Sequence, residues 1–250
     1  MQPGFFFGSS RYRKQGLIDR PVALHSNAMS IPQFIIIEVQ ASASSPAMAY
    51  AAASMSALSR YSGRLLLAGP VDDAEVLEEG SEAHAVVVFK FPSACEAEKF
   101  WLSDANQSAF DPVSQDPGFL HAVSVAGIPE EGLPGEPLPT TANVIIPDRP
   151  GPAAWMLVQG TVSDPGPIGK YMETIVPMIV ERGGVYRAWT APEGPEVLAG
   201  DWPAQYLVLS QWPSAAVARD FWYSDTYQNV AIPLRKPASD FSVLLFRSDA

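Results

Sequence analysis

The sequence predicts an α+β protein in which two copies of one βαββαβ module pack sheet against sheet within a single chain. Three observations lead to this prediction. The 250 residues repeat themselves at one constant offset, the predicted strands are apolar on both faces, and a proline-rich segment separates the two copies.

The internal repeat is found by shifting the chain by 121 residues, at which motifs come into line without a gap. A single constant offset for so many motifs indicates a duplication. The aligned pairs are Phe34–Ile37 with Trp155–Val158, Tyr50 with Tyr171, Ser62-Gly63 with Gly183-Gly184, Glu75–Leu77 with Glu196–Leu198, Phe91–Ser93 with Trp212–Ser214, Trp101–Asp104 with Trp222–Asp225, and Gln107 with Gln228.

The second copy shows the element order most clearly. We expect a helix over 164–182, because Asp164-Pro165 is typical of a helix start and Gly183-Gly184 of a helix end. Ser214 can cap a second helix that runs to about Asp225. Residues 191–203 are rich in proline and glycine and predict a loop. Apolar and β-branched runs predict strands over 153–160, 185–190, 206–212 and 241–246.

The first copy predicts the same order. Its helices fall near 46–61 and 93–104. Its strands fall near 33–40, 64–69, 84–91 and 118–126.

The strands carry a constraint on the architecture. Runs such as Val86–Phe89 and Leu207–Leu209 are apolar at every position, whereas a strand with one wet face alternates. Both faces of each sheet must therefore be covered. Helices cover only one face of a βαββαβ sheet, so the other face needs a second sheet, which the other copy supplies.

The domain boundaries follow from the repeat. We expect an N-terminal extension over 1–30, the first repeat over 31–127, a linker over 128–152 and the second repeat over 153–250. Prolines crowd the linker and favour an extended chain that crosses between modules. Residues 1–28 precede Met29 and are interpreted as an upstream extension, a cloning remnant or an arm packed on the body.

The composition excludes several classes of function. Hydrophobic residues make up 47% and charged residues 17%, which is typical of a globular protein with a sizeable core. The net charge of −11 argues against nucleic acid and anionic membranes as partners. Cys95 is the one cysteine, so no internal disulfide can form, and with no signal peptide or membrane span recognised we expect a cytoplasmic protein.

The second copy resembles the family catalogued as DUF1330 over nearly all of 154–247. The first copy resembles it more weakly, through Tyr61–Gly63, Glu75–Gly80 and Trp101–Gln107. The matching residues of the second copy are Tyr171, Pro177, Gly183-Gly184, Glu196–Leu198, Gly200–Trp202, Trp212–Ser214, Ala218, Trp222–Asp225, Tyr227-Gln228 and Leu234-Arg235.

This resemblance implies the ferredoxin-like fold of the dimeric α+β barrel superfamily, here as an intramolecular pseudo-dimer that could pair again into a homodimer. That superfamily includes cofactor-free isomerases and lyases, haem-degrading monooxygenases, dye peroxidases and small-ligand sensors, so fold alone does not fix the chemistry. The chain also departs from the family pattern. Gln205-Tyr206 stands where an arginine is expected, and Arg235 aligns with Ser114 in the first copy.

The two copies differ in a way that predicts one asymmetric pocket at the centre of the pseudo-dimer. Arg187 and Trp189 are expected on one face of their strand, whereas their counterparts Leu66 and Ala68 are apolar and small. The alternative interpretation is that the five tryptophans of the second copy are core residues and that Arg187 forms an ordinary surface ion pair.

The remaining candidate site residues also lie in the second copy. An arginine could hold a substrate carboxylate, a phenol could act as a general acid, and a carboxylate in an apolar pocket could act as a base. For each residue alone a structural role is the simpler reading. The catalytic candidates are Arg187, Glu196, Tyr223, Tyr227 and Arg235, and the substrate-binding candidates are Tyr171, Trp189, Trp202 and Trp222.

Three functional hypotheses remain open. The first is a cofactor-independent isomerase, lyase or cyclase acting on a small aromatic or carbonyl compound between the sheets. The second is a non-catalytic module that binds a small ligand or serves assembly. The third is haem-dependent oxidation, which requires His84 or His121 to face the cavity as a haem ligand; either histidine could instead serve as a general base. No cluster with metal-ligand spacing is present, and neither a metal nor another cofactor is expected.

Overall fold

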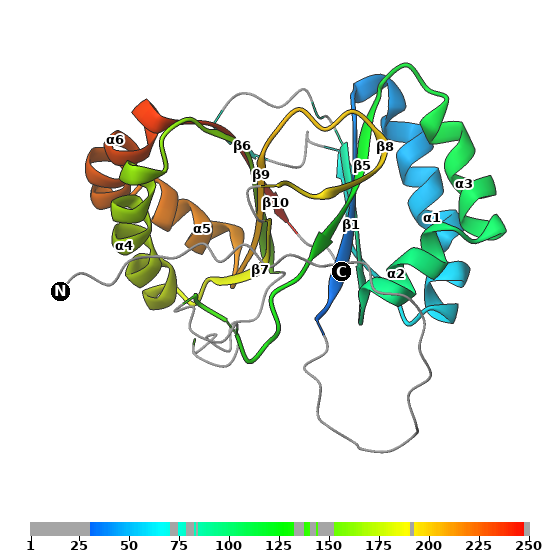
Figure 1. The fold of residues 1–250 in the computed structure, drawn as a ribbon, viewed down its shortest axis with the longest axis horizontal. Coiled ribbons are helices and arrows are strands. Elements are labelled where there is room, and N and C mark those ends of the chain that lie inside the picture. Colours follow the sequence, from blue (N-terminus) through cyan, green and yellow to red (C-terminus); the bar gives the residue numbers. More distant parts are fainter. Residues whose placement is uncertain are drawn as a thin grey trace, which may run out of the picture.

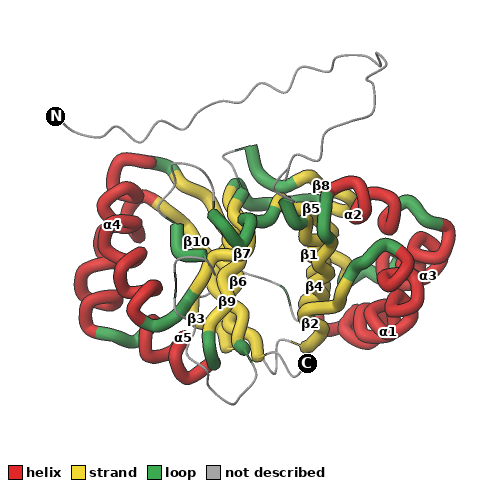
Figure 2. Tube along the Cα trace, turned by 90° about the horizontal axis from the view of Figure 1, so that it is seen from below, coloured by secondary structure: helices red, strands yellow, loops and turns green. Residues whose placement is uncertain are grey.

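The computed structural model describes residues 31–70, 75–78, 83, 85–132, 138–140, 144, 153–190 and 193–247. The predictions for residues 1–28, for His84 and for most of the linker lie outside the described residues. Two antiparallel five-stranded sheets face each other, and helices cover the outer face of each (Figure 1). Viewed from below, the same four layers run helix, sheet, sheet, helix (Figure 2).

The first repeat builds most of one sheet, which we call sheet A. Its helices are α1 (Ser44–Arg60), α2 (Ala94–Trp101) and α3 (Asp104–Ser114), with a short 3-10 turn over Ala41–Ala43. Its strands are β1 (Gln33–Val39), β2 (Arg64–Pro70), β3 (Glu75–Glu78), β4 (Ala85–Phe91) and β5 (Phe119–Ala126).

The second repeat builds most of the other sheet, sheet B. Its helices are α4 (Pro165–Glu181), α5 (Ala215–Trp222) and α6 (Ile232–Arg235), with a π turn over Tyr227–Ala231 and a 3-10 turn over Lys236–Ala238. Its strands are β6 (Ala154–Val162), β7 (Val185–Trp189), β8 (Glu196–Gly200), β9 (Tyr206–Trp212) and β10 (Ser239–Arg247).

The two repeats exchange one strand each. Sheet A has the order β2-β4-β1-β5-β8, and sheet B has the order β3-β10-β6-β9-β7. Strand β8 of the second repeat therefore pairs with β5, and β3 of the first repeat pairs with β10. The label of β8 beside β5 in Figure 1 shows this crossing. Each repeat thus completes the sheet of the other.

The prediction that both faces of the sheets are covered is confirmed. All seven residues of β1 are buried, and they alternate between two cores. Ile35, Ile37 and Val39 pack toward the helices of the first repeat, whereas Phe34 and Ile36 pack between the sheets. The inter-sheet core takes Trp155, Leu157, Leu207, Leu209, Leu244 and Phe246 from the second repeat.

The helix boundaries agree closely with those expected from the sequence. The Asp164 side chain accepts a hydrogen bond from the backbone N–H of Gly166, and the Ser214 side chain accepts one from that of Val217. Gly183 follows α4 with a φ of +71°, a left-handed conformation that favours glycine.

Three elements differ from the expectation. The helix expected over 93–104 is interrupted at Leu102-Ser103, and Ser103 caps a further helix, α3. The segments 75–78 and 196–200 are strands, although 196–200 was expected to be loop. Both are short and half-exposed, and they are ordered by pairing with the opposite sheet.

Candidate functional site

The inter-sheet core is mostly apolar, but a group of polar side chains lies near one end of the sheets. We call this group the central polar cluster; it consists of Glu38 in β1, His121 in β5, Gln159 in β6 and Trp202 in the β8–β9 connection. Alternation along the strands places the first three on the inter-sheet face. Glu38 follows Phe34 and Ile36, and Gln159 follows Leu157, in that core.

Glu38 and Gln159 occupy equivalent positions of the two repeats, since 159 is 38 plus the offset of 121. Gln159 Nε2 donates a hydrogen bond to Glu38 Oε1, so the two side chains meet where the repeats face each other. Glu38 has no exposed surface and Gln159 is 7% exposed. A carboxylate buried to this degree needs such a donor, because burial without hydrogen bonds is costly.

His121 and Trp202 complete the cluster on one side only. His121 Nε2 lies 3.3 Å from Glu38 Oε1, and the imidazole meets the Trp202 indole edge-on, with ring centroids 4.8 Å apart. His121 is in register with Gly200, which brings the following loop and Trp202 over the imidazole. The residue equivalent to His121 in the second repeat is Ser242, so the cluster is asymmetric.

The cluster leaves hydrogen-bonding capacity unused. Glu38 Oε2, His121 Nε2 and Trp202 Nε1 are buried atoms that make no hydrogen bond to the described residues. His121 Nε2 is within ion-pair distance of Glu38, but its geometry is not that of a hydrogen bond. Buried polar atoms are nearly always partnered, so three in one group make the central polar cluster a candidate functional site.

A second group, the helix-side cluster, lies on the outer face of sheet B. It consists of Glu78, Tyr171, Tyr227 and Arg235. Both terminal nitrogens of Arg235 donate to the carboxylate of Glu78, which reaches this position on the exchanged strand β3. The Tyr171 and Tyr227 hydroxyls are 3.2 Å apart, and the guanidinium lies 5.7 Å from the centre of the Tyr171 ring.

Burial shapes the ionisation of the helix-side cluster. It raises the pKa of Tyr171 and raises that of Tyr227 well above the usual value, so both phenols stay protonated at neutral pH. Burial alone would lower the pKa of Arg235, but the hydrogen bonds to Glu78 and the electrostatic effects of Tyr227, Tyr171 and Glu78 together outweigh it, and the pKa is raised. The cluster is thus a fixed charge pair flanked by neutral hydroxyls, with Arg235 Nε its one unpartnered buried atom.

The first repeat has lost the equivalent of the helix-side cluster. Tyr171 and Tyr227 align with Tyr50 and Asn106, and the Tyr50 hydroxyl donates to Asn106 Oδ1 at 2.7 Å. Arg235 and Glu78 align with Ser114 and Ala199, so the charge pair has no counterpart there.

The structure brings some of the residues predicted from the sequence together and separates others. Tyr171, Trp222, Tyr227 and Arg235 form one contiguous group, because the Trp222 and Tyr227 rings lie 4.8 Å apart. Trp202 belongs to the central polar cluster. Glu196 is exposed on β8, and Tyr223 is exposed and donates to Glu75 Oε1 at 3.0 Å.

Arg187 and Trp189 do not follow the simple alternation that the sequence predicted. The register of β7 with β9 shifts between Tyr186 and Ala188, which breaks the period of two. The Trp189 ring packs against Tyr186 on the helix side. Arg187 instead donates two hydrogen bonds to Gln211 Oε1, at 2.9 and 2.7 Å.

Neither a metal site nor a haem site is evident in the described residues. They contain no group of three metal-ligating side chains. A histidine that ligates haem turns a ring nitrogen toward a wide cavity, whereas His121 Nε2 faces Glu38 and the imidazole meets Trp202. His121 is therefore not placed as a haem ligand. No helix of the described chain is long and apolar enough to cross a membrane.

The fold and the paired sheets define the chain as a dimeric α+β barrel in which two ferredoxin-like repeats are joined in one polypeptide. The chain belongs to the DUF1330 family, described as a domain of unknown function, whose model matches residues 32–113 and 153–248. The resemblance seen in the sequence is thereby confirmed for both repeats. No curated protein matches the sequence significantly.

Solved structures with a similar arrangement share little sequence with this chain. A candidate monooxygenase from Fusobacterium nucleatum subsp. nucleatum ATCC 25586 is 9% identical, with 88% of this chain and 93% of that chain covered and a TM-score of 0.49. An anthrone oxidase-like protein is 11% identical, with 90% and 93% covered and a TM-score of 0.47. Chlorite dismutase from Candidatus Nitrospira defluvii in complex with imidazole is 8% identical, with 89% and 92% covered and a TM-score of 0.45. These likenesses concern the fold and carry no argument about activity.

Proposed function

We propose that the protein is a cofactor-independent enzyme of the isomerase or lyase type, acting on a small carbonyl compound at the central polar cluster. The observation that carries the proposal is the convergence of three buried polar atoms without a hydrogen-bond partner, Glu38 Oε2, His121 Nε2 and Trp202 Nε1. A carboxylate and an imidazole 3.3 Å apart are a pair suited to moving protons.

Each member of the cluster has a distinct role in the proposal. Glu38 Oε2 removes a proton from the carbon next to the carbonyl, and the C–H electron pair moves toward the carbonyl oxygen to give an enolate. The Trp202 N–H, together with His121 when Nε2 carries a proton, donates to that oxygen. Gln159 holds Glu38 Oε1, so that Oε2 is the free oxygen.

The electrons balance without an oxidant or reductant. Return of the proton to another carbon isomerises the substrate, and expulsion of a group on the next carbon gives a lyase reaction. Access is through Trp202, which is half-buried and sits in the connection of residues 201–205. A substrate would displace this indole from His121, and the aromatic ring would then cover the bound molecule.

The test is proton exchange, which needs no knowledge of the product. Purified protein is incubated in D₂O with small aliphatic and aromatic ketones and 1,3-dicarbonyl compounds, and deuterium incorporation beside the carbonyl is followed by proton NMR. We expect exchange above the buffer rate for at least one compound. Glu38→Gln keeps the shape and an acceptor for Gln159 but removes the base, so we expect that rate to fall by about 10²–10⁴-fold.

Two further variants test whether the exchange depends on the carboxylate of Glu38 in particular. Glu96→Gln removes a carboxylate from the surface of α2 and leaves exchange unchanged. Glu196→Gln tests the catalytic role expected from the sequence at an exposed position. Exchange that is lost in Glu196→Gln but kept in Glu38→Gln would contradict the assignment to the central polar cluster. Binding of a compound without exchange in the wild-type protein would favour a non-catalytic ligand-binding module.

A further inference from the structure

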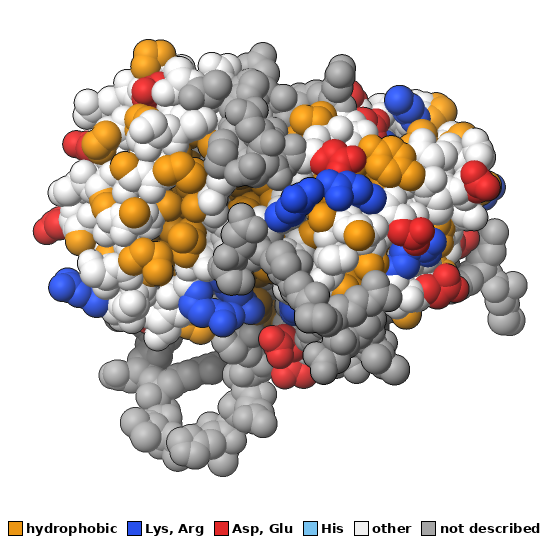
Figure 3. Space-filling model, turned by 180° about the vertical axis from the view of Figure 1, so that it is seen from behind, with side chains coloured by type: hydrophobic (Ala, Val, Ile, Leu, Met, Phe, Trp, Pro, Cys, Tyr) orange, Lys and Arg blue, Asp and Glu red, His pale blue; other side chains and the backbone are white. Residues whose placement is uncertain are grey.

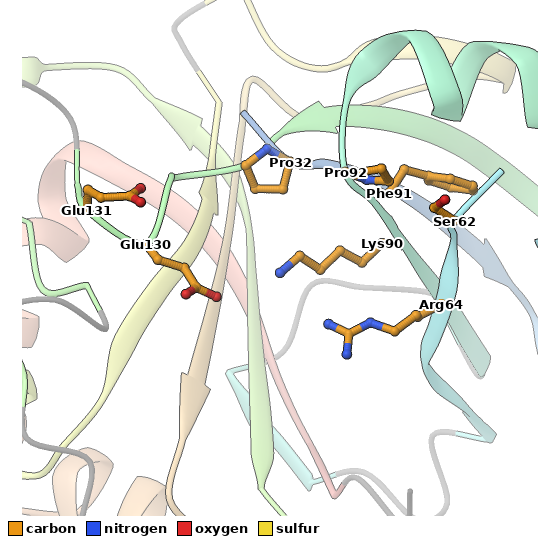
Figure 4. A pocket seen from close by; sticks show the side chains of 8 residues that line it. All are labelled: Pro32, Ser62, Arg64, Lys90, Phe91, Pro92, Glu130 and Glu131. Carbon is orange, nitrogen blue, oxygen red and sulfur yellow. The ribbon is translucent and has the colours of Figure 1, made fainter. Parts of the chain in front are cut away.

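A pocket of about 350 Å³ opens at the other end of the inter-sheet space. Its walls come from the ends of β2 and β4 and from the segment that follows β5. Figure 4 shows the side chains that line it: Pro32, Ser62, Arg64, Lys90, Phe91, Pro92, Glu130 and Glu131.

The basic wall of this pocket is built by strand register. Lys90 continues the alternation of Val86 and Val88, which face the inter-sheet core, so its side chain leaves β4 on that same face. Arg64 is directly opposite Lys90 in the β2–β4 pair and projects beside it (Figure 4). Arg187, at the edge of sheet B, is not one of the residues that line the pocket, but its charge acts on Lys90. On the molecular surface seen from behind, Lys and Arg side chains gather in a few separate groups (Figure 3).

The charge of Glu130 acts on Lys90 and Arg187, but it forms no close ion pair with either of them. No ion pair joins Arg64, Lys90 or Arg187 to a carboxylate in the described part of the chain. Burial, followed by the fields of Arg187 and Arg64, lowers the pKa of Lys90. Lys90 is half-buried beside the exposed Arg64, and an anion that binds between the two relieves their repulsion.

The two carboxylates that line the pocket, Glu130 and Glu131, do not take the place of a bound anion. Glu130 points toward Lys90 from the opposite side and acts on Lys90 and Arg187 only through its field. Both Glu130 and Glu131 are exposed, so water and salt screen their charges. Arg64 is exposed as well, so the half-buried Lys90 is the charge in the pocket that water screens least.

The arrangement belongs to the first repeat alone. Lys90 and Arg64 align with Gln211 and Val185, so the second repeat has no equivalent pair of cations. Gln211 instead accepts both hydrogen bonds from Arg187 and holds that guanidinium in place. A basic group at each of these positions is therefore not required by the fold.

We propose that this pocket binds the carboxylate or phosphate group of a small molecule between Arg64 and Lys90. Guanidinium and ammonium groups form their strongest hydrogen bonds with such oxyanions. The site is separate from the central polar cluster, because Lys90 is in register with Phe34 and Glu38 with Val86. Four residues along β1 separate them, or roughly 13 Å.

The test is a titration of the whole ¹⁵N-labelled protein with sodium phosphate and, separately, with sodium acetate, at neutral pH and constant ionic strength. Amide shifts in two-dimensional NMR spectra report binding. We expect saturable shifts at Arg64, Lys90 and Phe91 with at least one of the two anions. Saturation with phosphate alone identifies a phosphate site, and saturation with acetate alone identifies a carboxylate site.

Variants with matched charge complete the test. Lys90→Gln introduces the residue that stands at the equivalent position of the second repeat, and we expect it to weaken binding by about tenfold or more. Lys99→Gln removes the same charge from the exposed face of α2 and leaves binding unchanged. Shifts that grow linearly with both anions, or equal affinity in Lys90→Gln, would overturn the proposal. Neither result depends on whether Glu38 is a catalytic base.

Discussion

At the scale of the residue, the ion pair between Arg235 and Glu78 joins the two repeats through buried charges. The Arg235 side chain is 1% exposed and that of Glu78 15% exposed, and the guanidinium also lies 5.2 Å from the centre of the Phe241 ring. A buried pair of this kind adds little net stability, but removing one partner strands the other charge away from water. The contribution of each residue therefore depends on the presence of the other.

We expect Arg235→Met to lower the free energy of unfolding by about 3–5 kcal/mol, because Glu78 is left without its cation. Replacing Glu78 with Met in the same chain should recover part of that loss. Urea unfolding of the two single variants and the double variant measures the coupling. Arg219→Met is the control, since its pairing with Glu75 is more exposed and should contribute about 1 kcal/mol or less. Equal losses for Arg219→Met and Arg235→Met would show that burial does not set the effect.

Sequence analysis identified two of the four members of the central polar cluster as candidate residues and missed the other two. Trp202 was predicted as a site residue, and His121 was considered as a general base or a haem ligand. Glu38 and Gln159 were missed, although each is a polar residue at an inward position of an otherwise apolar strand. Their relation at the offset of 121 is visible in the sequence. Their contact is not, because it requires the two sheets to be set face to face at one register.

At the scale of the element, the two exchanged strands are the part of the fold that links the sheets of the two repeats. Strands β3 and β8 are short, with four and five residues, and each pairs with the sheet of the other repeat. Pattern alone could not predict them, because half-exposed segments in loop-like surroundings lack the apolar period of a strand. Their partners lie far away in the chain, and local sequence does not encode those partners.

Gly200 ends β8 in a conformation that other residues rarely adopt. Its φ is +73°, and a Cβ atom there would lie 2.3 Å from the backbone oxygen of Leu120. We expect Gly200→Ala to lower the free energy of unfolding by at least about 1–2 kcal/mol, because both strain and a backbone clash must be relieved.

Gly69→Ala provides the comparison for Gly200→Ala in a urea titration. Gly69 also lies in an edge strand, β2, but nothing lies within 4 Å of a Cβ atom added there. We expect a change of less than about 0.5 kcal/mol. If both variants unfold at the same urea concentration, Gly200 does not hold β8 in place.

At the scale of the whole molecule, the sequence predicts that two sheets pack face to face. It does not predict that each repeat adds a strand to the sheet of the other. Strands that are apolar on both faces require a second sheet, and the repeat supplies one. The structure adds that neither sheet is complete within its own repeat. The two repeats should therefore unfold together.

This cooperativity can be measured because the natural fluorophores are unevenly distributed. Five of the six tryptophans lie at 155, 189, 202, 212 and 222, so fluorescence reports mainly on the second repeat, whereas far-ultraviolet circular dichroism reports on both. We expect urea unfolding curves from the two signals to coincide, as for a two-state transition. Separate midpoints would show that each repeat is stable without the strand it receives.

Glu38 can contact Gln159 because the two repeats of a fused chain are free to differ in sequence, whereas identical subunits are not. In a symmetric homodimer the positions facing each other across the two-fold axis must carry the same amino acid. A buried glutamate would then face a second glutamate, and the two carboxylates would compete for one proton. A glutamine would face only another amide, and no acid would be present. When both copies are in one gene, the two equivalent positions can differ. The carboxylate of Glu38 then accepts a hydrogen bond from Gln159 and does not face a second carboxylate.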